Sequence, residues 1–265
     1  MVGEAMAARP QLIRARGLGK RYSAPGSDPV QALERVDFDV YQGEFISIVG
    51  PSGCGKSTLL KILAGLLPYS SGELHFNGQR VTRPSHEVGM VFQAPILLPW
   101  RTILQNVLLP VEIRRLDQVE YERSARKLLA LVGLAGFENR YPSDLSGGMQ
   151  QRAAIVRALV QDPRVLLMDE PFGALDAMTR EQMNLEVLKL WEESRKTVLF
   201  VTHSITEAIF LAKRVFVMST RPARLARIIE IDLPYPRRLD VVNTERFGGY
   251  AREVRQLLNA RGDLS

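Results

Sequence analysis

The spacing of apolar side chains predicts that the first third of the chain is rich in strands. Between residues 36 and 40, apolar positions alternate with two aspartates, which is the period of a half-buried strand. Residues 45–49 form a more continuous apolar run, as expected of a buried strand. A helix is predicted over residues 57–67, ending beside a proline. Further strands are predicted at residues 74–81, whose central Asn-Gly pair favours a hairpin, and at residues 88–92.

The apolar pattern changes to a helical period from about residue 94 to residue 161. Ile103, Val107 and Val111 recur on one helical face. We interpret this region as a helical subdomain inserted into a strand-rich core. Strands and helices then alternate, with strands at 165–168, 198–202 and 215–219 and helices beginning near 179 and 204. Such alternation predicts an α/β fold with a mainly parallel sheet.

The C-terminal part of the sequence predicts one more helix. Phe247, Ala251, Val254 and Leu258 lie on one side of a predicted amphipathic helix. The segment before this helix is rich in arginine and contains several prolines.

Composition and charge change this picture only slightly. The 265 residues are 46% hydrophobic and 24% charged, as in an ordinary globular protein, and the net charge of +6 first suggests a nucleic acid or an anionic membrane as partner. The charge lies at the ends, however, with +4 on residues 1–24, +3 on residues 220–265 and −1 on the stretch between them. This distribution argues against a nucleic-acid binder, whose charge usually follows its working surface.

Cysteine usage and hydropathy indicate the compartment. The single cysteine excludes an internal disulfide and fits a reducing environment. The N-terminus lacks an apolar stretch of signal-peptide length, and no apolar run approaches the roughly 18 residues that cross a bilayer. We therefore expect a cytoplasmic chain, or one peripheral to a membrane.

A phosphate-binding loop is the clearest motif. Residues 50–57 fit the pattern G-x-x-x-x-G-K-[ST] between a buried strand and a helix, although an ordinary glycine-rich turn is the alternative. The glycines let backbone N–H groups and the helix N-terminus surround a phosphate. Lys56 would reach the β- and γ-phosphates and Ser57 would bind Mg²⁺. The predicted nucleotide contacts here are Gly50, Pro51, Ser52, Gly53, Cys54, Gly55, Lys56, Ser57 and Thr58.

Two adjacent carboxylates end the predicted strand at residues 165–168. Asp169 suits the Mg²⁺ partner of a phosphate-binding loop, and Glu170 would face the γ-phosphate and its attacking water. The alternative is a solvated strand end before the turn at Pro171. The phosphate-binding loop favours the functional interpretation.

A third motif, Leu-Ser-Gly-Gly-Met-Gln-Gln-Arg, occupies residues 145–152. Ser146 can cap a helix, and Gly147 and Gly148 leave its N-terminal N–H groups open to an anion. With the phosphate-binding loop before it and the Asp-Glu strand end after it, the chain resembles the ATP-binding cassette (ABC) family from about Leu12 to Thr220. The resemblance implies a P-loop NTPase core of the α/β class, an antiparallel β subdomain and an inserted α-helical subdomain.

The resemblance implies further roles, position by position. Tyr22 would stack on adenine, and Gln93 would sense Mg²⁺ and the attacking water. Asp176 would lie in the loop that crosses a dimer seam, and His203 would contact the γ-phosphate. Ser146, Gly147 and Gly148 would contact the γ-phosphate of ATP held by the other subunit of a homodimer. The predicted catalytic residues are therefore Glu170, His203, Gln93 and Lys56, and the predicted Mg²⁺ ligands are Ser57, Gln93 and Asp169.

The resemblance also suggests a domain division and a biological role. Residues 1–220 would form the ATPase domain, with the helical subdomain at about 94–161, and residues 221–265 a basic C-terminal extension. The motifs at residues 93–101, 171–176 and 233–238 resemble the nitrate/sulfonate/taurine importer subfamily. Met149 and Gly173 depart from the commonest family residues in a way that is familiar in bacterial importers.

The function expected from this resemblance is ATP hydrolysis that powers the uptake of a small solute. The partners would be integral-membrane permease subunits and, indirectly, a solute-binding protein. The chain itself would be peripheral, at the cytoplasmic face of the inner membrane. The apolar loop at residues 94–101 is a candidate docking surface for a permease helix. The alternative is a non-transport ABC ATPase that acts on nucleic acid or the ribosome.

Two further hypotheses concern the single cysteine and four arginines near the C-terminus. Cys54 fills a free position of the phosphate-binding loop, where a helix N-terminus can lower a thiol pKa and make the thiol reactive. Arg221, Arg224, Arg237 and Arg238 could lie near an anionic leaflet or the permease, although solvated surface charge explains them as well.

Overall fold

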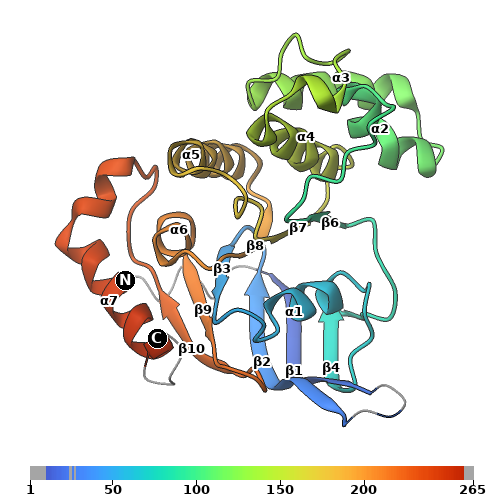
Figure 1. The fold of residues 1–265 in the computed structure, drawn as a ribbon. Helices are drawn as coiled ribbons and strands as arrows, with labels where there is room; N and C mark the ends of the chain where they lie inside the picture. The colour runs from blue at the N-terminus through green and yellow to red at the C-terminus, as the bar shows by residue number, and fades with distance from the viewer. Residues whose placement is uncertain (1–9, 24–25, 27, 260–265) are drawn as a thin grey trace. The chain divides into compact units, whose positions relative to one another are not determined.

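The computed structural model describes residues 10–23, 26 and 28–259. Its chain divides into two compact units (Figure 1). The first consists of Met1–Ser85 and Arg195–Ser265, and the second of His86–Ser194. The predicted boundary between residues 220 and 221 stays a prediction, and the described part of the predicted C-terminal extension belongs to the first unit.

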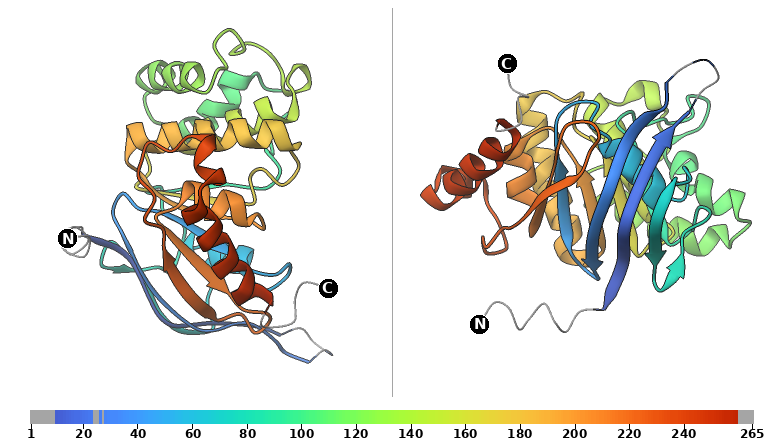
Figure 2. Two further views of the ribbon diagram at one scale, coloured as in Figure 1. Left: turned by 90° about the vertical axis from the view of Figure 1, so that its left-hand side faces the viewer. Right: turned by 90° about the horizontal axis from the view of Figure 1, so that it is seen from below.

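An antiparallel sheet forms one part of the first unit. Its strand order is β2 (Val30–Tyr41), β1 (Gln11–Tyr22), β4 (Ser71–Phe76) and β5 (Gln79–Arg80). The long strands β1 and β2 run side by side (Figure 2). Asn77 and Gly78, between β4 and β5, have φ angles of 49° and 75°. Two positive φ angles are the mark of a type I′ hairpin turn, and β4 pairs with β5 in antiparallel register, so the predicted hairpin is confirmed.

A mainly parallel arrangement forms the other sheet of the first unit. Its order within this unit is β10 (Leu225–Glu230), β9 (Arg214–Met218), β3 (Phe45–Val49) and β8 (Thr197–Val201). Strand β3 is parallel to β8 and β9, whereas β10 is antiparallel to β9. Every residue of β3, β8 and β9 is buried, which explains their continuous apolar runs.

Buried aromatic and ionic contacts hold this sheet together. The ring centroids of Phe45 and Phe200 lie 6.1 Å apart, on the adjacent strands β3 and β8. Arg214 on β9 is buried and forms an ion pair with the buried Glu44. Removing either partner would leave a buried charge unpaired, so this pair fixes one arrangement of the two chain segments.

The helices of the first unit are α1 (Lys56–Leu63), α6 (Ile205–Leu211) and α7 (Glu245–Asn259). The predicted helix over 57–67 is shorter than expected, because Gly65 has a φ of +70° and turns the chain. A Cβ at Gly65 would lie only 2.3 Å from the carbonyl oxygen of Arg83, so no larger residue fits there. The predicted amphipathic helix is α7, which packs against α6 and buries Phe247 and Val254.

The second unit combines two parallel strands with helices. It contains β6 (Val88–Val91), α2 (Ile103–Ile113), α3 (Gln118–Leu131), α4 (Gly147–Leu159), β7 (Val165–Asp169) and α5 (Ala177–Ser194). Strand β6 pairs with β7 in parallel. Helices α2, α3 and α4 pack on one another (Figure 1) around Val107, Val111 and Leu129, whose side chains are fully buried.

Two arginines of the C-terminal segment, Arg237 and Arg224, have partners within the chain. The hypothesis that Arg237 faces a membrane or a permease is wrong, because its side chain is 4% exposed and donates to backbone carbonyls. Arg224 is exposed but forms an ion pair with Glu34 at 2.9 Å. Among the described residues, no helix combines the length and the apolar character needed to cross a membrane.

Candidate nucleotide-binding and catalytic site

The phosphate-binding loop follows β3 and leads into α1, as the motif predicts. Gly53 and Gly55 have φ angles of 71° and 128°, which side chains rarely tolerate. A Cβ at Gly55 would also lie 3.1 Å from the carbonyl oxygen of Ala32. Gly53 is therefore required by its backbone conformation, and Gly55 both by its backbone conformation and by close packing on β2.

Lys56 is folded over this loop. Its side chain is buried, and its Nζ donates hydrogen bonds to the carbonyl oxygens of Gly50 and Pro51 at 2.8 and 3.0 Å. These contacts hold a positive charge within the curve of the loop, at the first turn of α1. The helix N-terminus adds its own positive potential there, so the loop suits a phosphate.

Tyr22 lies beside the same loop. Its hydroxyl is 3.3 Å from the hydroxyl of Thr58, and the ring centroid is 5.1 Å from the Nζ of Lys20. The residue is 42% exposed, so much of its surface is open to a ligand. The structure thus brings the predicted adenine-stacking aromatic to the edge of the phosphate-binding loop.

His203 follows strand β8 on an exposed turn before α6. Because β3 and β8 are parallel neighbours and Ile48 pairs with Val201, the turn with His203 and the phosphate-binding loop leave the same edge of the sheet. The hydroxyl of Ser204 caps α6 by accepting a hydrogen bond from the N–H of Glu207 at 3.3 Å. This cap fixes the turn that carries the histidine.

The predicted catalytic carboxylate belongs to the second unit. Glu170 follows the last residue of β7 and has a φ of +45°, an uncommon conformation for a residue with a side chain. Its carbonyl oxygen accepts a hydrogen bond from the N–H of Gly173 at 3.1 Å. Sequence reasoning missed this backbone strain, which places the side chain just beyond the strand end.

Gln93 lies at the corresponding end of β6. Val91 pairs with Met168 in the parallel ladder, so Gln93 and Glu170 both stand two residues beyond a paired position. A Cβ at Gly173 would lie 3.4 Å from the Nε2 of Gln93 and 3.4 Å from the carbonyl oxygen of Glu170. The second unit therefore brings Gln93, Asp169 and Glu170 to one edge, with Gly173 between two of them.

The signature motif begins helix α4 as expected. Ser146 is the N-cap, and its hydroxyl accepts a hydrogen bond from the N–H of Met149 at 3.3 Å. Gly147 is exposed with open space around it, whereas a Cβ at Gly148 would lie 2.9 Å from the side chain of Thr179. Gly147 thus leaves the helix end open, whereas Gly148 allows close packing against Thr179.

Asp176 lies directly before helix α5. Its carboxylate accepts hydrogen bonds from the hydroxyl and the N–H of Thr179 at 2.6 and 3.0 Å. These hydrogen bonds lower the pKa of Asp176, so the carboxylate is charged near neutral pH. The predicted position in a dimer seam stays a prediction.

Helix α4 also holds the segment that contains Gln93. The amide of Gln151 donates to the carbonyl oxygen of Phe92 at 3.1 Å, and the guanidinium of Arg157 donates to those of Pro95 and Ile96 at 2.7 and 2.8 Å. Sequence reasoning missed both contacts. The only signal was polar side chains among the apolar positions of the helix.

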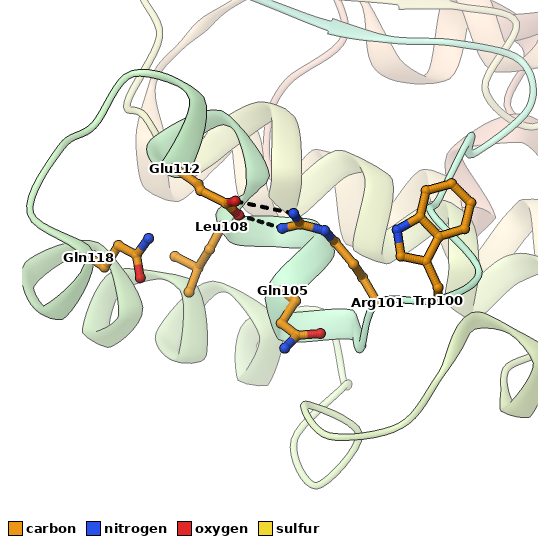
Figure 3. A pocket seen from close by; sticks show the side chains of 6 residues that line it. All are labelled: Trp100, Arg101, Gln105, Leu108, Glu112 and Gln118. Atoms are coloured by element: carbon orange, nitrogen blue, oxygen red, sulfur yellow. Dashed lines mark hydrogen bonds and ion pairs between the residues drawn. The ribbon is translucent and has the colours of Figure 1, made fainter.

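The apolar loop at 94–101 leads to a groove in the second unit. This groove has a volume of about 500 Å³ and is lined by Trp100, Arg101, Gln105, Leu108, Glu112 and Gln118 (Figure 3). Trp100 is 70% exposed. Arg101 and Glu112 form an ion pair across the groove wall, which lowers the pKa of Glu112. The prediction of an exposed apolar loop is confirmed at Ile96 and Trp100, which are large exposed residues.

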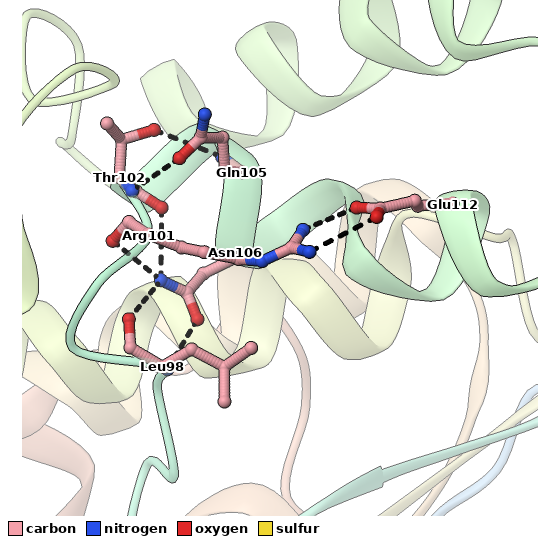
Figure 4. Close-up of polar contacts among 6 residues, drawn as sticks. All are labelled: Leu98, Arg101, Thr102, Gln105, Asn106 and Glu112. Carbon is pink, nitrogen blue, oxygen red and sulfur yellow. Dashed lines mark hydrogen bonds and ion pairs between the residues drawn. The ribbon is translucent and has the colours of Figure 1, made fainter.

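Asn106 fixes the shape of this loop. Its buried side chain donates to the carbonyl oxygens of Leu98, Arg101 and Thr102 and accepts a hydrogen bond from the N–H of Leu98 (Figure 4). Thr102 and Gln105 form a capping box at the start of α2. The backbone beneath Trp100 is therefore rigidly held although the indole itself is exposed.

The hypothesis of a reactive Cys54 is not supported by its surroundings. The thiol is 2% exposed, and burial raises its pKa more than the charge of Lys56 lowers it. A thiolate is the reacting form, so a raised pKa and burial both slow modification.

We expect the folded protein to react with a water-soluble maleimide at pH 7 at least about tenfold more slowly than the urea-unfolded chain. The rate in the folded state should increase only as the pH passes above the ordinary thiol pKa. The measurement is mass-spectrometric labelling over time, with Cys54→Ala as the blank. Equal rates in the folded and unfolded chains would contradict the raised pKa.

The sequence of this chain is similar to those of ATP-binding transport subunits. Residues 33–173 match the family model described as ABC transporter. The chain is 44% identical over 236 residues to the aliphatic sulfonates import ATP-binding protein SsuB of Bacillus cereus, covering 89% of this chain and 92% of that protein. It is 48% identical to the taurine import ATP-binding protein TauB of Roseobacter denitrificans, covering 84% and 82%.

Solved structures give the same family. A bacterial ABC transporter cassette solved as a dimer superposes with a TM-score of 0.73 at 34% identity, covering 84% of this chain and 100% of that one. A post-hydrolysis dimer of the same cassette, bound to ADP and Pi, superposes with a TM-score of 0.73 at 33% identity. The predicted fold class, an α/β ABC cassette, is thereby confirmed, and this chain belongs to the ABC transporter family and is an ATPase.

Proposed function

We propose that this chain is the ATP-hydrolysing subunit of an importer for a small solute such as a sulfonate, taurine, nitrate or a related compound. The observation that carries this proposal is the similarity to sulfonate and taurine import subunits over more than four fifths of each chain. The import system would include membrane permease subunits and a solute-binding protein. The chain would work as a homodimer at the cytoplasmic face of the inner membrane.

In this proposal the phosphate-binding loop holds ATP and Tyr22 stacks on its adenine. Lys56 and His203 offset negative charge on the transferring phosphoryl group. Glu170 orients the attacking water and accepts its proton, and Gln93 helps to position that water. Ser146, Gly147 and Gly148 of a partner copy would complete the site.

The predicted ligands are suited to Mg²⁺. Ser57, Gln93 and Asp169 supply hydroxyl, amide and carboxylate oxygens, and Mg²⁺ prefers oxygen ligands. In the described part of the chain no cluster of three or more His, Cys, Asp or Glu side chains could hold a metal by itself. Phosphate oxygens and water would supply the remaining ligands, as is usual for Mg²⁺ at a phosphate site. The bound ion would neutralise charge on the phosphates.

A permease explains the exposed loop better than nucleic acid does. The groove beside Trp100 combines an exposed indole with Leu108 and an internal ion pair. An amphipathic helix can insert apolar residues into such a groove. The central part of the chain, residues 25–219, carries a net charge of −1, which offers little attraction to phosphodiesters.

The test is the Trp100→Ala variant. We expect it to keep ATP binding but to lose most co-purification with a multi-span membrane protein from detergent-solubilised host membranes. Truncating a central interface tryptophan commonly costs about 2 kcal/mol or more of binding free energy. Mass spectrometry identifies the captured protein. Uptake of labelled taurine, alkanesulfonates and nitrate is measured in cells that carry the variant in place of the wild type.

Ile113→Ala is the matched control, since Ile113 is 73% exposed on α2 but does not line the groove. The control should retain both capture and uptake. Equal capture by the Trp100→Ala variant and the wild type would refute this docking surface. Unchanged uptake of all the tested solutes in cells lacking the chain would refute the proposed solute class.

A further inference from the structure

The turn between β9 and β10 lies against the phosphate-binding loop. A Cβ at Gly50 would lie 3.1 Å from the Cβ and the carbonyl oxygen of Met218. A Cβ at Gly55 would lie 3.6 Å from the Cβ of Ala223. Residues 218–223 therefore pack along the loop at both of these glycines.

The middle of this contact is polar. The guanidinium Nη2 of Arg221 donates a hydrogen bond to the carbonyl oxygen of Gly53 at 2.7 Å. The two residues are 168 positions apart in the sequence. Arg221 is exposed, so its side chain reaches the loop from the solvent side of the turn. Its charge also acts on the neighbouring Cys54.

The turn is anchored independently of Arg221. The N–H of Ala223 donates to the carbonyl oxygen of Ala32 at 3.0 Å, and the carbonyl oxygen of Ala223 accepts from the N–H of Glu34 at 2.9 Å. Arg224 forms its ion pair with Glu34 on the same strand. Strand β2 thus supports the turn, and the turn can hold the loop.

The contact has a geometric consequence for the loop amides. In a planar trans peptide the carbonyl oxygen and the following N–H point in opposite directions. The hydrogen bond from Arg221 to the carbonyl oxygen of Gly53 therefore fixes the direction of the N–H of Cys54. This N–H points into the loop, where it donates a hydrogen bond to the carbonyl oxygen of Pro51 with an N–O distance of 3.2 Å. Loop N–H groups that point inward are the ones that receive a phosphate.

We propose that Arg221 is a positioning residue of the ATP site, which holds the Gly53–Cys54 peptide with its N–H directed into the phosphate-binding loop. This inference rests on the proposed nucleotide site at residues 50–58. Arg221 acts through the loop backbone and takes no part in the chemical step. It therefore affects nucleotide affinity far more than turnover.

The experiment compares Arg221→Gln, Arg221→Lys and Arg224→Gln in the full-length protein. We expect Arg221→Gln to raise the KM and the Kd for ATP about tenfold, the effect of losing one charged hydrogen bond, while kcat stays within about twofold. Arg221→Lys should recover part of the affinity, since an ammonium can still donate to a single carbonyl. Arg224→Gln removes an exposed ion pair in the same turn but no contact with the loop, and the two backbone hydrogen bonds of Ala223 still anchor the turn to β2, so both constants should stay unchanged.

The readouts are steady-state ATPase kinetics, calorimetric ATP binding and thermal unfolding. An equal rise in KM for the Arg221→Gln and Arg224→Gln variants, or a fall in kcat without a change in KM, would overturn the proposal. An unchanged KM in Arg221→Gln would do the same. Lys56→Ala separates the two hypotheses: if it too binds ATP normally, the proposed nucleotide site fails, and if it loses binding while Arg221→Gln does not, only the role of Arg221 fails.

Discussion

The Glu170→Gln variant is expected to bind ATP as the wild type does and to hydrolyse it about 100- to 10,000-fold more slowly, which is the contribution of a positioned general base. Glutamine keeps the length and shape of the side chain but cannot accept a proton from water near neutral pH. The backbone should stay in place, because the strained φ of Glu170 is held by the hydrogen bond from the N–H of Gly173. Phosphate release under saturating ATP measures this loss.

A second readout follows from the proposed homodimer. Because hydrolysis is blocked while binding is kept, the variant should accumulate as an ATP-bound dimer. Size-exclusion chromatography with light scattering distinguishes this dimer from the monomer. Lys56→Ala is the contrasting variant, since it should lose nucleotide affinity as well as turnover and remain monomeric with ATP. Near-normal turnover in Glu170→Gln would remove Glu170 from the catalytic role.

The second large effect is expected for stability, in Arg237→Met. The guanidinium of Arg237 donates to the carbonyl oxygens of Ile209, Phe210 and Ala212 at 2.7, 2.8 and 3.0 Å, and to that of Leu233 at 3.1 Å. The first three carbonyls lie at the C-terminal end of α6, where the helix leaves its acceptors unsatisfied. Arg237 thus replaces the missing donors and places a positive charge at the negative end of the helix dipole.

Methionine keeps the apolar stem of Arg237 but removes every donor. Four buried carbonyls then lose a charged hydrogen-bond partner, so we expect a loss of about 3 kcal/mol in the free energy of unfolding. For a chain of this size the loss corresponds to roughly 8 °C in the midpoint of thermal unfolding. Because arginine stays protonated at all accessible pH values, the loss should be the same at pH 6 and pH 9.

Arg238→Met is the matched control, since Arg238 is adjacent in sequence but exposed. It should change the unfolding midpoint by little. A midpoint for Arg237→Met equal to that of the control would show that α6 ends without help from this arginine. Binding of both variants to anionic vesicles then tests the charge separately, because only the exposed arginine is available to a lipid surface.

The local conformations of the nucleotide site followed from the sequence because each is set by neighbouring residues. The glycines at 53 and 55 allow positive φ angles, and the serine at 146 caps a helix that begins at the next residue. A pattern of this kind needs no distant partner. The Asn-Gly hairpin at residues 77 and 78 is predictable for the same reason.

Strand β10 was not predicted from the sequence. Its residues alternate only weakly between apolar and polar, and the strand lies at an edge of the sheet, paired with β9. An edge strand has one neighbour and little burial, so its sequence pattern is weak. The helix at residues 56–63 ended early at Gly65, which has a positive φ and packs so closely against the backbone of Arg83 that no side chain fits there.

By itself the sequence determined the family, the order of the motifs and which side chains carry the predicted chemistry, because these are properties of short segments. Only the tertiary structure decided the partners of the arginines: Arg221 on the phosphate-binding loop, Arg237 on the end of α6 and Arg157 on the segment after Gln93. Each of these contacts joins segments far apart in the chain and ends on a backbone carbonyl. Every residue carries such a carbonyl, so no residue type marks the acceptor in the sequence.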